Sequence, residues 1–295
     1  MFMTRKMFVT LMAITVVWGG QTAARPPQGH LLIMGGEIHE ATIMQTFTRL
    51  AGAERAKLIV FPMASSIAKE TGAQKAKQLR DYGAGETIVL NITKAQANSD
   101  SVRQLLKGVT GVFFSGGDQS RLTAALKGTA VEAWLHEFYA RGGVIGGTSA
   151  GAAVMSAMMI TGDQRRPVGD STFNTIEAEN IVTSAGFGFI DNAIIDQHFV
   201  RRKRFNRLLS LVLEHPQLVG IGIDENTAIW VKPDQTFEVI GAGPVLVIDA
   251  TKAQTRRDEA GYGLRAQEIR LQVLRNGSVY DLRKRKVARL NPEQK

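Results

Sequence analysis

Residues 146–152 of the chain are Gly146-Gly147-Thr148-Ser149-Ala150-Gly151-Ala152, and the apolar run Gly143-Val144-Ile145 precedes them. This order predicts a buried strand, a very tight turn and then a helix. The segment Gly147–Gly151 fits the G-x-S-x-G pattern of a nucleophile elbow, in which a serine is exposed at the end of a strand. The alternative is a helix start rich in glycine and alanine, in which Ser149 serves only as the N-cap.

Short apolar runs alternate with helical patterns on the N-terminal side of this elbow. Strands are expected at residues 30–34, 57–61, 87–90 and 111–114, with helices near 44–50, 69–82 and 100–107. Apolar strands without alternation, separated by helices, predict a mostly parallel central sheet with helices on both faces. The sequence therefore predicts an α/β fold.

Small or polar residues stand where four of these strands end, at Gly35-Gly36, Ala64–Ser66, Ser115–Gln119 and the Ser149 turn. Open α/β sheets bind their ligands at the carboxyl ends of the strands. A backbone N–H of Gly116 or Gly117 could complete an oxyanion hole with that of Ala150. The alternative for residues 115–119 is an ordinary glycine-rich turn. No P-loop appears there, and no dinucleotide-binding fingerprint follows the first strand.

The chain becomes polar between about residues 160 and 190, a length that predicts a functional loop or flap. Beyond it, strands are expected at 193–195 and 219–223. The helix expected between them carries Arg202, Arg204 and Arg207. On an ideal helix, Arg202 and Arg204 would lie about 200° apart and could not share one face.

The C-terminal part is predicted to consist of short β segments. They lie at 228–232, 237–240 and 245–248, and Asn276-Gly277 predicts a hairpin. No linker separates them from the preceding strands. We therefore expect residues 25–295 to form one α/β domain.

Composition limits the classes of partner and chemistry. The 295 residues carry a formal net charge of +9 and include no cysteine. Basic residues are mostly scattered among acidic ones, with clusters at 201–207 and 283–289, and no nucleic-acid-binding motif is recognised, so no nucleic-acid partner is expected. The lack of cysteine excludes disulfides, a lipoprotein anchor and a thiol nucleophile. We expect no metal or cofactor, and the sequence leaves open whether the chain forms a homodimer.

Residues 1–24 have the pattern of a secretory signal peptide. Arg5-Lys6 precedes an apolar stretch at 7–18, and Thr22-Ala23-Ala24 supplies small residues after it. The stretch is short for a transmembrane span, although an uncleaved membrane anchor is the alternative. We expect removal of the signal to leave no stable membrane span and the protein to be secreted or periplasmic.

A serine hydroxyl becomes a good nucleophile when a histidine, oriented by a carboxylate, removes its proton. Of the five histidines, only His198 directly follows a strand at the edge where the elbow is expected. The acid is Asp224 or Glu225, which end the next strand, and only one of two adjacent strand residues can face His198. The order Ser, His, acid differs from the Ser, acid, His order of α/β-hydrolases.

Four segments together resemble the serine peptidase family that contains cyanophycinase and aspartyl dipeptidase. They are residues 113–119, 146–152 and 222–228, and Asp196-Gln197-His198-Phe199 with Arg202, Arg204 and Arg207. These segments span most of residues 30–230. The resemblance implies the fold of class I glutamine amidotransferases, with serine in place of their cysteine.

This resemblance also implies roles for individual residues. It selects Glu225 as the acid of a Ser149–His198–Glu225 triad. It places six further side chains around the substrate, which are Gln119, Asp196, Gln197, Arg202, Arg204 and Arg207. Residues 240–295 are less distinctive, and the resemblance implies no roles for them.

The resemblance, together with the predicted signal peptide, implies a secreted serine exopeptidase. The family substrate is cyanophycin, a poly-aspartate chain with arginine on each side-chain carboxyl, which is cleaved to β-aspartyl-arginine dipeptides. Ser149 would form an acyl-enzyme, with N–H groups of Gly117 and Ala150 holding the oxyanion. Two alternatives stay open: an aspartyl or isoaspartyl dipeptidase of the same fold, and a non-catalytic binding protein that retains the fold.

Overall fold

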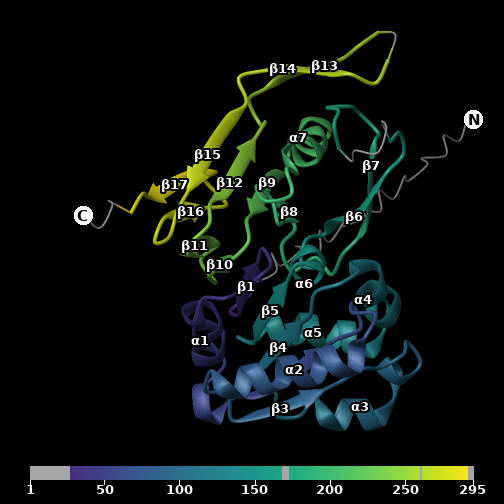
Figure 1. The fold of residues 1–295 in the computed structure, drawn as a ribbon, viewed down its shortest axis with the longest axis vertical. Helices are drawn as coiled ribbons and strands as arrows, with labels where there is room; N and C mark the ends of the chain where they lie inside the picture. The colour runs from purple at the N-terminus through teal and green to yellow at the C-terminus, as the bar shows by residue number, and fades with distance from the viewer. Residues whose placement is uncertain (1–26, 168–172, 260, 292–295) are drawn as a thin grey trace, which may run out of the picture.

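The computed structural model describes residues 27–167, 173–259 and 261–291, and its largest sheet has nine strands (Figure 1). Five of these strands are parallel and lie in the order β3-β2-β4-β5-β1. Their bounds are β1 (His30–Met34), β2 (Lys57–Phe61), β3 (Glu86–Val89), β4 (Gly111–Phe114) and β5 (Val144–Thr148). Antiparallel strands extend the sheet beyond β1, namely β10 (Thr227–Val231), β11 (Thr236–Gly241), β16 (Val279–Asp281) and β17 (Lys286–Arg289).

The parallel strands are buried on both faces. In β1, Leu31 and Ile33 face one core, and Leu32 and Met34 face the other. The first core is covered by α4 (Gln119–Leu126) and α5 (Ala130–Ala140), and the second by α1 (Ala41–Leu50) and α2 (Ala68–Asp81). Short helical segments complete this half, at η1 (Ala53–Arg55), η2 (Gln96–Asn98) and α3 (Asp100–Leu105). Burial on both faces explains why these strands are apolar throughout.

A second sheet of four strands carries the part of the chain that follows the elbow. Its order is β15-β12-β9-β8, with β8 (Ala193–Gln197), β9 (Val219–Ile223), β12 (Val245–Asp249) and β15 (Arg270–Leu274). One face, which includes Ile195 and Ile221, shares the core of the first sheet, and the other packs against α7 (Phe205–Glu214). A Cβ at Gly220 would lie 2.6 Å from the Val212 side chain, so α7 rests on the strand backbone.

The predicted α/β fold, with a mostly parallel central sheet and added C-terminal strands, is confirmed. The sequence did not indicate that β8 and β9 lie in a sheet of their own. The hairpin predicted at Asn276-Gly277 is wrong, because β15 pairs with β12 whereas β16 pairs with β11 and β17. The N–H of Gly277 instead donates to the carbonyl of Val239, so the turn passes the chain from one sheet to the other.

The polar stretch at 160–190 is partly regular structure rather than a loop. Strands β6 (Met158–Gln164) and β7 (Ile181–Ala185) form an antiparallel ribbon, and β13 (Gln254–Arg257) pairs with β14 (Leu264–Gln267) as a second one. The predicted signal peptide at 1–24 lies outside the described residues. No helix in the described part of the chain has the length and hydropathy needed to cross a membrane.

The elbow is confirmed as a strand–turn–helix unit between β5 and α6 (Ala150–Ala153). Ser149 has a φ of 53°, an unfavourable backbone conformation for a residue with a Cβ. Its N–H donates to the carbonyl of Met34 on β1. A Cβ at Gly147 would overlap the carbonyl group of Gly151, and a Cβ at Gly151 would overlap the carbonyl group of Phe114. Both glycines are therefore needed for α6 to lie against the sheet.

The substitution Gly151→Ala tests this close packing. We expect it to lower the free energy of unfolding by about 1–3 kcal/mol, because α6 must move away from β4 to admit the methyl group. The matched control is Gly261→Ala, whose Cβ would enter open space. Urea unfolding measures both variants, and a Gly151→Ala protein as stable as the control would contradict the packing argument.

Candidate functional site

The three residues of the predicted catalytic triad lie close together, each just after the end of a different strand. Ser149 follows β5, His198 follows β8 and Glu225 follows β9. The Nε2 atom of His198 lies 2.9 Å from Oγ of Ser149, and its Nδ1 atom lies 2.8 Å from Oε1 of Glu225. The structure therefore brings a hydroxyl, an imidazole and a carboxylate into one hydrogen-bonded chain.

The turn after β1 packs against the ring of His198. A Cβ at Gly36 would overlap the ring, and Gly36 has a φ of 119°, so this position requires glycine. The backbone N–H of His198 donates to the carbonyl of Gly35 at 2.8 Å. The His198 side chain is only 4% exposed, and the backbone of this residue has a φ of 49°. Its orientation is thus set by backbone contacts as well as by Glu225.

Burial and the neighbouring arginines act on the pKa of His198 in one direction, and Glu225 acts in the other. Desolvation lowers the pKa of the imidazole below 6.5, and it is the largest contribution. The hydrogen bond and the charge of Glu225 raise the pKa, whereas Arg202 and Arg204 lower it. Because the net shift is downward, the ring is neutral at pH 7 and can accept a proton.

The sequence left the acid open between two adjacent residues, and their side chains take different partners. Glu225 faces His198, whereas Oδ1 of Asp224 accepts the N–H groups of Val200 and Arg201 at 3.1 and 3.0 Å. Asp224 therefore fixes the turn after His198. The Nε atom of Arg201 lies 3.8 Å from Oε2 of Glu225, which adds a cation on the outer side of the carboxylate.

A polar pocket of about 350 Å³ opens beside Ser149. Its walls come from the start of α4, the end of β6 and the segment after β8. The lining residues are Gly117, Asp118, Gln119, Ser120, Ser149, Thr161, Gly162, Asp163, Gln197, Arg202, Arg204 and Arg207. The pocket therefore contains every predicted substrate-binding residue except Asp196.

The glycine turn after β4 lies against the serine, where the sequence placed an oxyanion hole. A Cβ at Gly116 would be 3.4 Å from Cβ of Ser149. Gly117 has a φ of 137°, and a Cβ there would overlap the carbonyl group of Ala64. Ala150 starts α6 on the other side of the serine. Their roles as oxyanion donors stay predictions.

The three predicted arginines differ in their partners. Arg207 forms a buried two-point ion pair with Asp196, in which Nε donates to Oδ2 at 2.7 Å and a terminal nitrogen donates to Oδ1. Arg204 donates to the carbonyl of Gln197 at 2.8 Å and lies 3.9 Å from Asp196. Within the described chain, the guanidinium of Arg202 has neither a hydrogen bond nor an ion pair.

The predicted helix placement of Arg202 and Arg204 is wrong. The helix begins at Phe205, after a turn in which Lys203 has a φ of 53°. Asp224 holds this turn by accepting two of its N–H groups. Both arginines can therefore line one pocket, although a continuous helix would have separated them.

The two predicted glutamines have different surroundings. The amide nitrogen of Gln119 donates to the carbonyls of Ile160 and Thr161, at 2.7 and 2.5 Å, and so joins α4 to β6. Gln197 is buried, and its Oε1 atom has no hydrogen-bond partner among the described residues. Substrate binding by Asp196, Gln119, Gln197 and the arginines stays a prediction.

Several residues whose roles could not be read from the sequence shape the site. Asn226 accepts the N–H groups of His39 and Glu40 through Oδ1 and donates its own N–H to the carbonyl of Gly36. It therefore holds the turn beneath His198. Gly36 and Asn226 both follow the ends of strands. This position was the one feature of the sequence that could have indicated a role in the site. No group of histidine and acidic side chains in the described ranges has the arrangement of a metal site.

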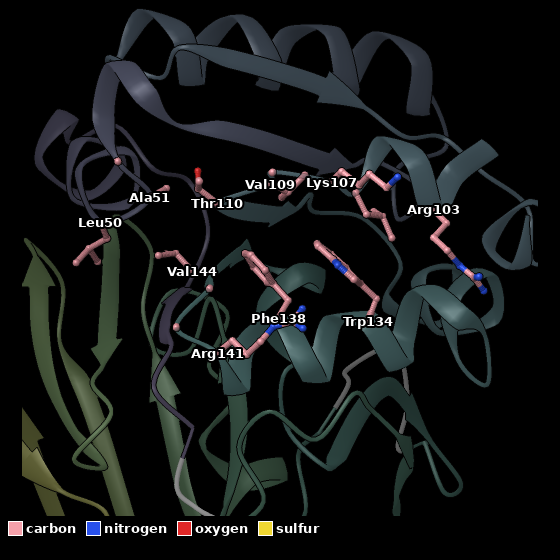
Figure 2. A pocket seen from close by; sticks show the side chains of 15 residues that line it. Leu50, Ala51, Arg103, Lys107, Val109, Thr110, Trp134, Phe138, Arg141 and Val144 are labelled. Atoms are coloured by element: carbon pink, nitrogen blue, oxygen red, sulfur yellow. The ribbon is translucent and has the colours of Figure 1, made fainter. Parts of the chain in front are cut away.

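A larger cavity, of about 630 Å³, lies at the amino ends of the parallel strands, opposite the ends that Ser149 follows (Figure 2). It is bordered by the starts of β4 and β5 and by Trp134 and Phe138 of α5. Its charged side chains are Arg103, Lys107 and Arg141. No nucleophile–base pair lies there, so the pocket beside Ser149 is the candidate site.

Comparisons with known proteins show the family of the chain. Residues 31–239 match Peptidase family S51. The chain is 35% identical to a cyanophycinase of Trichormus variabilis, with 87% of each chain covered, and 33% identical to one of Geminocystis herdmanii, with 85% of this chain and 93% of that one covered. A crystal structure of a peptidase from an acI-B1 Actinobacterium has the same fold, with a TM-score of 0.59 over 84% of this chain and 98% of that one, at 22% identity.

The fold and these relatives define a serine-type peptidase. The chain belongs to Peptidase family S51, as the match over most of its length and the identity to the curated relatives show.

The buried pair of Asp196 and Arg207 gives a stability prediction. We expect Arg207→Met to lower the free energy of unfolding by about 3–5 kcal/mol, because it leaves the Asp196 carboxylate buried without its partner. Arg202→Met is the control, since its guanidinium has no partner to lose, and its stability should stay near that of the wild type. Chemical denaturation measures both, and equal effects would contradict the distinction.

Proposed function

We propose that the protein is an exported serine exopeptidase that hydrolyses cyanophycin to β-aspartyl-arginine dipeptides. The observation that carries this proposal is the hydrogen-bonded chain of Ser149, His198 and Glu225 at the mouth of a polar pocket. The curated relatives named cyanophycinase, at 32–35% identity, support the substrate.

The first step of the proposed mechanism is attack by Ser149 on a backbone carbonyl carbon of the substrate. His198 accepts the hydroxyl proton at Nε2 as the Oγ–carbon bond forms. Glu225 accepts the proton of Nδ1 in a hydrogen bond, which fixes the tautomer and stabilises the imidazolium. The low pKa of His198 suits this role, because the ring must be neutral before the attack.

The tetrahedral intermediate places a negative charge on the former carbonyl oxygen. The N–H groups of Gly117 and Ala150 are the proposed donors, since they flank Ser149. His198 then returns its proton to the leaving amine, the carbon–nitrogen bond breaks and an acyl-enzyme remains. Water attacks that ester with His198 again as the base. The Oγ–carbon bond then breaks, the carboxylic acid product leaves, and His198 returns the proton to Ser149.

The pocket chemistry supports a substrate that carries both charges. A cyanophycin unit presents the carboxylate and the guanidinium of its arginine. The pocket contains arginines, which bind carboxylates through paired hydrogen bonds, and it also contains carboxylates. An apolar peptide side chain would find few partners among these groups.

Export is the second part of the proposal, and it rests on the charged start, the apolar stretch and the small residues of positions 1–24. A secreted enzyme would degrade polymer that other cells release. Cell fractionation tests export: the full chain should reach the periplasm or the medium, and a chain without residues 1–24 should stay in the cytoplasm. The same location for both chains would contradict export.

Activity on defined substrates tests the enzyme and its substrate together. We expect the protein to release dipeptides from cyanophycin, but to leave β-Asp-Arg, Asp-X dipeptides and casein intact. Ser149→Ala should lose at least roughly a thousandfold of this activity, because it removes the nucleophile. Cleavage of the dipeptides without the polymer would support a dipeptidase. Wild-type protein that binds cyanophycin but neither cleaves it nor reacts with a serine-directed phosphonate would support a binding protein.

The pH profile tests the assignment of His198 and Glu225. A lowered pKa keeps His198 neutral in mild acid, so kcat/KM should fall to half only below pH 6.5. Glu225→Gln should reduce kcat/KM by about three to four orders of magnitude. It should also move the acid limb to lower pH, because both effects of Glu225 raise the pKa. A limb above pH 6.5, or a shift of the variant toward alkaline pH, would contradict the assignment.

A further inference from the structure

Three helices end around the larger cavity at the amino ends of the parallel strands (Figure 2). The residues that follow α1, α3 and α5 line it, and they are 51–52, 106–108 and 141–143. The last four carbonyl groups of a helix have no partner within the helix, and they carry partial negative charge. Backbone N–H groups cap some of them, but the carbonyls of Leu50, Lys107 and Arg141 accept no hydrogen bond from any described residue. The cavity is therefore rich in hydrogen-bond acceptors.

A flat aromatic surface joins this cavity to a second one. The ring of Trp134 stacks on that of Phe138, with centroids 4.8 Å apart and ring planes at 17°. Figure 2 shows both rings projecting from α5 toward the segment that precedes β4. Trp134, Arg103 and Leu106 also line a cavity of about 300 Å³ between α3 and α5. The two cavities share these three side chains, and we call them together the Trp134 groove.

The Trp134 groove carries charges of both signs. Lys107 is exposed, and within the described ranges its ammonium has neither an ion pair nor a hydrogen bond. Arg103 and Arg141 lie 3.5 and 3.7 Å from Asp100 and Glu137, and all four side chains are mostly exposed. Exposed ion pairs are weak, so these cations stay available to a ligand. Glu137, which lines the second cavity, stays available as an acceptor in the same way.

We propose that the Trp134 groove is a second binding site for the cyanophycin chain, remote from Ser149. The inference rests on the proposed function, because it takes the same polymer as the ligand. A guanidinium of the polymer stacks on Trp134 and donates to the helix-end carbonyls and Glu137. Carboxylates of the polymer bind the cations of the groove. A ligand with charge of one sign would leave either the acceptors or the cations without partners.

A long polymer chain can occupy the groove and the pocket beside Ser149 together. Val144, at the start of β5, lines the groove, and Ser149 follows the end of the same strand, so the two sites lie about 15 Å apart along it. The second contact is then intramolecular, which raises the apparent affinity. The backbone of a two-unit oligomer extends about 7 Å and cannot reach from one site to the other. The groove therefore acts on long chains alone.

Kinetics on long and short substrates test the groove. The variants Trp134→Leu and Lys107→Gln remove the aromatic surface and the unpaired cation. With substrate counted as chain ends, we expect each variant to raise KM for long cyanophycin by about tenfold and to leave kcat unchanged. Both variants should keep the wild-type kcat and KM for a two-unit β-Asp-Arg oligomer.

Trp230→Leu and Lys77→Gln are the matched controls. Trp230 is partly buried on β10, Lys77 is exposed on α2, and neither lines the groove. Both controls should keep the wild-type KM for the polymer. Thermal unfolding shows which variants are folded, and if Trp134→Leu is not, the exposed Lys107 decides the test. A polymer KM that stays at the wild-type value, or an equal rise for polymer and oligomer, would overturn the inference.

The two proposals can fail separately. Wild-type protein that cleaves the polymer with a KM unaffected by the groove variants would overturn the second site and leave the proposed function standing. Wild-type protein that cleaves neither substrate would overturn the proposed function. Binding to bead-linked cyanophycin would then still test the groove. Weaker binding by the groove variants than by the controls would support the groove, and equal binding would overturn it.

Discussion

The geometry of the site depends on how the ring of His198 is held between two sheets. Gly36, at the end of a strand in the first sheet, lies under the ring, and Glu225, at the end of a strand in the second, orients it. Ser149 reaches Nε2 from the first sheet. A shift of one sheet against the other would therefore lengthen the hydrogen bond between His198 and Ser149, whereas His198 and Glu225 both follow strands of the second sheet and would move together. The close-packed core that the two sheets share resists such a shift.

Features set by short-range sequence were predictable. Glycine spacing around Ser149 predicts the elbow, and unbroken apolar runs predict parallel strands, because each signal lies within a few residues. The second sheet and the end of the turn at Phe205 were not predictable in this way. The turn after His198 is held by Asp224, more than twenty residues further along the chain. The prediction of a hairpin at Asn276-Gly277 failed for the same reason, because the strands on either side of this turn pair with strands that are distant in the sequence.

Arginines that look alike in the sequence have separate physical roles in the structure. Arg207 is buried with Asp196, and the pair ties α7 to β8. Arg204 is mostly buried beside that pair, and burial lowers its pKa to about 10, so it is still charged at neutral pH. Arg202 is exposed and lacks a partner among the described residues. A buried ion pair seldom adds net stability, and its value here is to fix the wall of the pocket that carries Arg202.

The amino and carboxyl ends of the parallel strands differ in the charge that they favour, and this explains why the larger cavity is not the candidate catalytic site. At its edge (Figure 2) the neighbouring helices end, and helix C-termini carry partial negative charge. Arg103 lies in the last turn of α3 and Arg141 follows α5, so these cations complement helix ends. Each also has an acidic partner within one helical turn. At the carboxyl ends of the strands, helix N-termini favour negative charge instead. A reaction that develops an oxyanion is therefore better placed beside Ser149 than in the larger cavity.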